Sequence, residues 1–180
     1  MKNASSASPI LKEKLKLKAA SEYNYLNQSN CLTIDRIDDS QKFHKLMEAF
    51  NTVQIPQEYQ ERALALLAAV LWLGNVSFEV IDNENHVDVV ADEVVTNVAM
   101  LMGCDSKELM VVLSTCKFQA GRDCIVKRLT LPQATDIKDS LAKIIYASLF
   151  NWLVEQINTS LEVGKLRTRR SISILDIYGL

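Results

Sequence analysis

The chain has 180 residues, of which 48% are hydrophobic and 23% are charged, with a formal net charge of −2. These are the proportions of a folded globular domain, and the weak charge argues against a nucleic acid partner, which favours a basic domain. The four cysteines form no C-x-x-C pair, so reduced intracellular thiols are expected and a zinc site is not. The longest apolar run, 63–73, is shorter than the roughly 20 residues that cross a bilayer, so no transmembrane segment is expected.

The spacing of the glycines excludes two common routes of nucleotide binding. A P-loop needs G-x-x-x-x-G-K-[ST] and a dinucleotide fold needs G-x-G-x-x-G, because only glycine lets the backbone approach phosphate oxygens closely. The glycines stand at neither spacing: Gly74, Gly103, Gly121, Gly164 and Gly179. No nucleotide is therefore expected to bind this chain through those motifs.

The first third of the chain predicts helices with recognisable ends. A short basic amphipathic helix is predicted over 11–18, on the surface, with an irregular segment after it. Asp38 offers a capping oxygen to the next helix, which should end before Pro56. A helix that is apolar on nearly all sides then runs from Pro56 to Gly74, and this pattern indicates that it is buried.

The middle of the chain predicts a hairpin, two helices and a long helix. Apolar residues alternate on both sides of the polar, acidic tip 82–85, which is typical of a β-hairpin. Two helices are predicted over 92–102 and 106–114, and 118–128 is predicted to be a second extended, looped segment. A T-x-x-Q capping box begins a long helix over about 130–163.

The last segment predicts a buried strand. The run 171–177 is rich in β-branched residues and becomes apolar on both faces, as in a strand of a parallel sheet. No second such strand is found, so the chain is expected to be incomplete. The predicted fold class is mainly α, with a β-hairpin and a terminal buried strand.

A D-x-x-G pattern, Asp176 to Gly179, follows this strand. In open α/β sheets ligands lie beyond the carboxyl ends of strands, where an aspartate can hold a Mg²⁺-bound water and a glycine N–H can meet a phosphate. A simple turn after a strand explains the same pattern. His44 and His86 are assigned no catalytic role, because no acid or nucleophile stands at a telling spacing from either.

Several charged residues gather just before the long helix. An ordinary solvated loop explains them without any partner. They are Lys117, Arg122, Asp123, Lys127 and Arg128.

Several runs carry a resemblance to a known family, in the family's own order: 134–146, 149–154, 157–158 and 174–179. They resemble the myosin motor head between switch I and switch II, and 66–77 is similar to the helix and hairpin of its upper 50 kDa subdomain. The sequences 21–26 and 154–158 are most similar to plant class VIII myosins.

The resemblance divides the chain into a non-matching N-terminal leader, 1–8, and a partial myosin motor domain, 9–180, that ends in switch II. It implies an incomplete piece of an α/β P-loop-type motor domain, without the P-loop and switch I upstream. The switch II glutamate, relay helix, lower subdomain and converter would follow downstream, but the chain stops at Leu180. The chain alone is therefore expected to be inactive as an ATPase.

The resemblance also assigns residues to roles. Asp176 is similar to the switch II aspartate that contacts Mg²⁺ through water, and Gly179 to the glycine whose amide meets the γ-phosphate. ATP and Mg²⁺ are thus expected in the parent motor and not on this chain alone. Segment 118–131 resembles the actin-facing cardiomyopathy loop, and 82–85 resembles loop 4. The residues of these two segments that are expected to face actin are Asp82, Glu84, Arg122, Asp123, Lys127 and Arg128.

The function that the resemblance implies is that of a fragment of an actin-based cytoskeletal motor, whose parent couples ATP hydrolysis to movement on actin filaments. Its partners would be the actin filament and the remainder of the heavy chain. Its location would be the cytoplasm, at the actin cytoskeleton, and the parent motor could also associate peripherally with a membrane. Two alternatives remain: a non-enzymatic helical module that binds actin or another partner, and an unstable truncated product.

Overall fold

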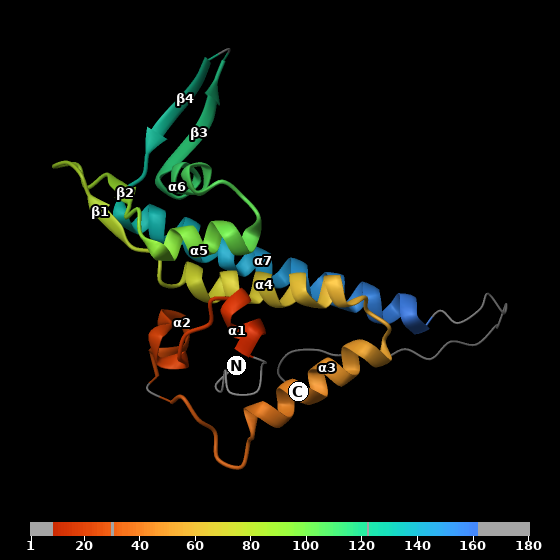
Figure 1. Ribbon diagram of the computed structural model, residues 1–180. Coiled ribbons are helices and arrows are strands. Elements are labelled where there is room, and N and C mark those ends of the chain that lie inside the picture. The colour runs from red at the N-terminus through yellow and green to blue at the C-terminus, as the bar shows by residue number, and fades with distance from the viewer. Residues whose placement is uncertain (1–8, 30, 122, 162–180) are drawn as a thin grey trace.

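The computed structural model describes residues 9–29, 31–121 and 123–161. In this part the chain is mostly helical, with two separate two-stranded antiparallel sheets at one end of the helices (Figure 1). The helices are α1 (Pro9–Lys14), η1 (Ala20–Glu22), α2 (Asn24–Asn27), α3 (Asp39–Thr52), α4 (Gln57–Leu73), α5 (Glu93–Met102), α6 (Ser106–Ser114) and α7 (Leu131–Leu161). The strands are β1 (Phe78–Val80), β2 (Val87–Val89), β3 (Thr115–Ala120) and β4 (Asp123–Arg128).

The starts of the longer helices follow their capping residues. The carboxylate of Asp38 accepts two backbone N–H bonds at the start of α3, and Asp92 and Asp105 do the same for α5 and α6. Before α7, the backbone N–H of Thr130 donates to Oε1 of Gln133 at 3.1 Å. The predicted helix starts at Asp38 and Thr130 are confirmed.

The core forms where α4 packs against α5 and α7. Trp72 of α4 is 1% exposed, and its ring meets the ring of Tyr23 edge-on at 5.7 Å between centroids. Val98 of α5 and Leu113 of α6 are fully buried in the same cluster. The predicted burial of the helix before Gly74 is confirmed, since α4 contributes more buried residues than any other described helix.

The N-terminal segment differs from the prediction. The helix ends at Lys14, and the expected irregular stretch contains η1 and α2. The segment is also not confined to the surface, because Leu15 and Tyr23 are buried. Its apolar residues are too few to define a helical face, and their tertiary contacts decide its shape.

One side chain ties this segment to the long helix. The hydroxyl of Tyr25 donates to Oδ1 of Asp139 in α7 at 2.5 Å, and the ammonium of Lys138 lies 5.7 Å from the centre of the Tyr25 ring. The Tyr25 ring also packs on Gly74, where a Cβ atom would lie only 2.8 Å from the ring. Glycine thus lets the N-terminal segment approach the end of α4.

The two halves of α7 have different surroundings. Ala134, Lys138 and Ala142 in its first half are buried. From Ile144 onward the helix exposes large apolar side chains, among them Tyr146, Phe150 and Leu161. The described helix reaches Leu161, and the predicted strand 171–177 lies outside the described residues.

Candidate functional site

The first hairpin is oriented by alternating burial. β1 and β2 pair with Phe78 opposite Val89 and Val80 opposite Val87. Val87 and Val89 are buried, so Asp88 between them faces outward. Asp88 stands directly opposite Glu79, and two like charges in such a pair destabilise the sheet unless a cation is near.

The tip of this hairpin is organised by Asp82. One oxygen of its carboxylate accepts the backbone N–H bonds of Glu84 and His86, each at 3.0 Å, and the other lies 2.7 Å from Nδ1 of His86. The hydrogen bond from His86 is the main reason why the pKa of Asp82 is lowered. Asp82 therefore shapes the turn, while Glu84 projects from it with an 81% exposed side chain.

The histidine at this tip has an acidic partner that the sequence analysis did not recognise. The prediction that no acid stands at a telling spacing from His86 is wrong, because the carboxylate of Asp82, four residues earlier, contacts its ring. The sequence signal that could have revealed this contact is the four-residue spacing of Asp82 and His86 across a turn-rich segment. The contact is structural in nature, since the pair closes the hairpin tip.

The segment predicted as an extended, looped stretch is a complete second hairpin. β3 and β4 pair along their whole length, from Thr115 opposite Arg128 to Ala120 opposite Asp123. Gly121 in the connection has a φ of 67°, which glycine adopts without strain. Every residue of β4 is exposed. The hairpin projects away from the helices (Figure 1).

The register of this hairpin divides the charged residues that the sequence grouped together. Side chains alternate between the faces of a strand, so Asp123 and Lys127 share one face and Arg128 lies on the other. Across the ladder, Lys127 stands opposite Cys116, and Ile125 stands opposite Phe118. The first face therefore combines both charges with exposed apolar side chains.

The main chain joins the tip end of the first hairpin to the base of the second. The N–H of Val87 in β2 donates to the carbonyl oxygen of Leu129 at 3.0 Å, and His86 and Thr130 form an isolated β-bridge. The N–H of Leu129 donates to the carbonyl oxygen of Ser114 at 2.9 Å. The side chain of Leu129 is buried against Val87.

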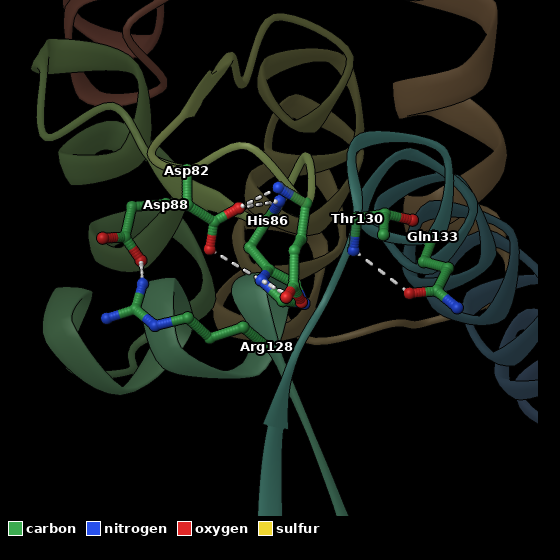
Figure 2. A network of polar contacts seen from close by, with 7 residues as sticks. Asp82, His86, Asp88, Arg128, Thr130 and Gln133 are labelled. Atoms are coloured by element: carbon green, nitrogen blue, oxygen red, sulfur yellow. Dashed lines mark hydrogen bonds and ion pairs between the residues drawn. The ribbon is translucent and has the colours of Figure 1, made fainter.

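An ion pair adds a side-chain link at the same place. Nη1 of Arg128 lies 2.5 Å from Oδ1 of Asp88 (Figure 2). The pair places a cation beside Asp88, whose cross-strand neighbour is Glu79. Sequence analysis missed Asp88, although its outward place in the alternation of β2 was a usable signal.

The residues expected to meet Mg²⁺ and phosphate, Asp176 and Gly179, lie outside the described residues, as does Arg122. Within 9–29, 31–121 and 123–161, no group of three or more His, Cys, Asp or Glu side chains could hold a metal ion. Nor does any helix of the described part combine the length and apolar character needed to span a membrane.

A groove runs between α4 and the part of α7 from Ile144 to Trp152. It encloses about 380 Å³ and has a mostly apolar lining. Six of the residues that line it are Tyr59, Arg62, Leu66, Ile144, Leu149 and Trp152. Tyr59 and Trp152 face each other across it, with ring centroids 6.5 Å apart.

Comparison with a family model and with individual known proteins points to the same family. The family model described as myosin head (motor domain) matches residues 3–180. Myosin-4 of Arabidopsis thaliana is 88% identical over 96% of this chain, and Myosin-2 of the same plant is 76% identical over 96%. Myosin-J heavy chain of Dictyostelium discoideum is 35% identical over 97%. The chain spans about 15%, 14% and 8% of these relatives. The expected similarity to plant class VIII myosins is confirmed.

Proposed function

This chain belongs to the myosin head family, and on that premise we propose that it forms part of the motor domain of an actin-based cytoskeletal motor. The observation that carries the proposal is the pair of joined hairpins, which project from a packed helical scaffold at the positions that resemble loop 4 and the cardiomyopathy loop. A rigid scaffold with exposed loops is a common arrangement of binding sites.

The second hairpin supplies the surface that would face the filament. Phe118, Ile125 and Val126 are large apolar residues that lie exposed on it, and Lys127 adds a cation on the face of Ile125. Apolar contacts supply affinity in such interfaces, while charges at the rim mainly set the association rate and its salt dependence. Asp123 shares that face, and Glu84 extends the surface from the first hairpin. Arg122, outside the described residues, is proposed as a further residue that faces the filament.

The remainder of the heavy chain is the second proposed partner. The groove between α4 and α7 has a mostly apolar lining, and Ile144 of that lining is also one of the exposed apolar residues of α7. Large apolar patches on a protein surface mark interaction sites. In the complete motor, other segments of the heavy chain would cover this surface.

ATP and Mg²⁺ are proposed for the complete motor. Asp176 would hold a Mg²⁺-bound water and Gly179 would present its amide to the γ-phosphate, as the family resemblance implies. Phosphoryl transfer depends on positioning the phosphates and the metal ion, a task that these two residues would share with the rest of the motor. The complete motor would act at the cytoplasmic actin cytoskeleton.

The test is filament binding by a complete motor domain that contains this sequence. Lys127→Ala should weaken co-sedimentation with actin filaments several-fold at low salt and make binding less salt-dependent, because one rim cation is lost. Lys107→Ala is the matched control, since Lys107 lies exposed on α6, outside both hairpins. Equal affinities for wild type, Lys127→Ala and Lys107→Ala would contradict the proposed surface.

A further inference from the structure

The ion pair between the hairpins gives Arg128 a role different from that of Lys127. We propose that the two hairpins dock as a single unit and that Arg128 is a positioning residue, which acts through Asp88 and makes no direct contact with the filament. This inference rests on the proposed function and deepens it. It assigns to the ion pair between Arg128 and Asp88 the task of holding the two hairpins in the orientation in which their surface meets the filament.

The position of Arg128 in the hairpin supports this role. It is the last residue of β4 and precedes Leu129, whose carbonyl oxygen accepts the N–H of Val87. Asp123 stands at the other end of β4, roughly 16 Å away at about 3.3 Å per residue. Arg128 is thus at the base of the projecting hairpin, where a small change of angle moves the tip through a larger distance.

The main-chain contacts alone leave one motion open. The Val87 to Leu129 hydrogen bond and the His86 to Thr130 bridge lie at neighbouring positions along one short line. A hairpin attached along a single line can still rock about it. The bond from Arg128 to Asp88 lies off the backbone, between side chains, and gives a further point of attachment (Figure 2).

The local charges make this attachment specific. Asp88 faces Glu79 across β1 and β2, so an unpaired Asp88 would leave two carboxylates opposed on that surface. Arg128 offsets this repulsion and draws β4 toward β2. Because the pair is neutral as a whole, Arg128 adds little to the positive field that a filament with an acidic surface would meet.

Positioning and direct contact predict opposite results for one substitution. Asp88→Asn removes a negative charge, which by simple electrostatics should strengthen binding to an acidic filament. If Asp88 acts by holding Arg128, the same substitution should weaken binding about two- to fivefold, as Arg128→Gln should. The exchange Asp88→Arg with Arg128→Asp should restore the affinity to within about twofold, because the pair is rebuilt with its charges reversed.

The experiment measures the affinity of these variants for actin filaments in a complete motor domain that contains this sequence. Weaker binding by both single variants and recovery in the exchange variant support the inference. Stronger binding by Asp88→Asn, or an exchange variant as weak as Arg128→Gln, would overturn it and make Arg128 a direct contact.

Amide hydrogen exchange without filaments separates this inference from the proposed function. Arg128→Gln and Asp88→Asn should raise exchange several-fold at Val87 and along β3 and β4, whereas Lys127→Ala should leave exchange there unchanged. Unchanged exchange in both pair variants would overturn the inference, whatever the binding results. Raised exchange in both pair variants, together with a wild type that binds no filaments, would instead refute the proposed function and leave the pair as a structural link between the hairpins.

Discussion

The helical core and the two hairpins are stabilised by interactions of different strength. Trp72 and Val98 in the core are at most 1% exposed, and their burial removes large apolar surfaces from water. β4 has no buried residue, and its hairpin depends on a tight turn, a hydrogen-bonded ladder and one partly exposed ion pair. Substitutions in the core should therefore change folding, and substitutions in the hairpins should change binding with little effect on folding.

The largest expected effect is that of Trp72→Ala. The ring is 1% exposed and packs against Tyr23, so its removal leaves a cavity at the centre of the core. The free energy of unfolding should fall by about 3–5 kcal/mol. Chemical denaturation of the full chain, followed by far-ultraviolet circular dichroism because the substitution removes a fluorophore, measures it.

Trp152→Ala is the matched control for this substitution. Trp152 lies in the groove beside Tyr59 and is only partly buried. Its truncation should cost less than half as much as that of Trp72, since the removed area is already partly in contact with water. Equal losses for the two tryptophans would mean that the groove contributes to the core as strongly as the centre does.

A smaller effect is expected at the contact between the N-terminal segment and α4. Gly74 has a φ of −57°, which alanine adopts freely, so backbone strain is not the cause of any loss. The added Cβ atom would lie 2.8 Å from Cδ2 of Tyr25, whose ring is held in place by Asp139. Gly74→Ala should lower the free energy of unfolding by about 1–3 kcal/mol, measured by denaturation.

Tyr25→Leu in the same chain tests whether this clash is the cause. A smaller, flexible side chain can move away from the new methyl group. The loss caused by Gly74→Ala should then shrink by more than half when it is measured in the Tyr25→Leu background. An unchanged loss would show that crowding against Tyr25 is not responsible.

Tyr25→Phe should have a smaller effect that depends on pH. It removes the hydrogen bond to Asp139, and solvent screens this part-exposed site, so about 1 kcal/mol should be lost at neutral pH. Burial, and then the Asp139 carboxylate, raise the pKa of Tyr25 above its ordinary value of 10.0. The folded state thus keeps a proton that the unfolded state loses above that value.

The raised pKa of Tyr25 can be tested through the pH dependence of the free energy of unfolding. The stability that Tyr25 contributes is fully present below pH 10 and declines as pH rises beyond it. The difference in free energy of unfolding between wild type and Tyr25→Phe should therefore shrink between about pH 10 and 11.5. A difference that stays constant over that range would show that Tyr25 does not titrate differently in the two states.

Much of the helical core could be predicted from the sequence. The aspartate caps and the apolar pattern of α4 are local signals, and the structure confirms the helices that they predict. The N-terminal segment could not be predicted in the same way, because Leu15 and Tyr23 are buried by contacts with distant residues. Local pattern carries no information on such long-range packing.

The hairpin site was predicted as a set of residues and not as an arrangement. The family resemblance identified Asp123, Lys127 and Arg128. Because their segment was predicted to be looped, no pairing of strands could be assigned to it. The register is what separates Lys127 from Arg128 and brings Arg128 to Asp88, 40 positions away in the chain. Partners so far apart are found only when both hairpins are placed in space.

The smallest effect on folding is expected at Asp123, the exposed first residue of β4. Asp123→Ala should change the free energy of unfolding by no more than about 0.5 kcal/mol, because the side chain is in water. Its effect on function should be larger. The family resemblance implies that this is the position where the family carries an acidic or phosphorylatable residue. The carboxylate of Asp123 would then supply permanently the negative charge that a phosphate would otherwise bring, though a smaller one.

Steady-state ATPase rates of a complete motor that contains this sequence test that difference at increasing filament concentrations. Asp123→Ala should weaken actin-activated turnover, Asp123→Glu should be nearly silent because it keeps the charge, and Asp35→Ala is the control because Asp35 is an exposed carboxylate remote in sequence from both hairpins. No kinase should be required for activation of the wild type. If wild type, Asp123→Ala and Asp123→Glu turn over equally at low salt, Asp123 is a solvated strand residue without a role in docking, and the separation of folding from binding would then have to rest on Lys127 and the Arg128 to Asp88 pair.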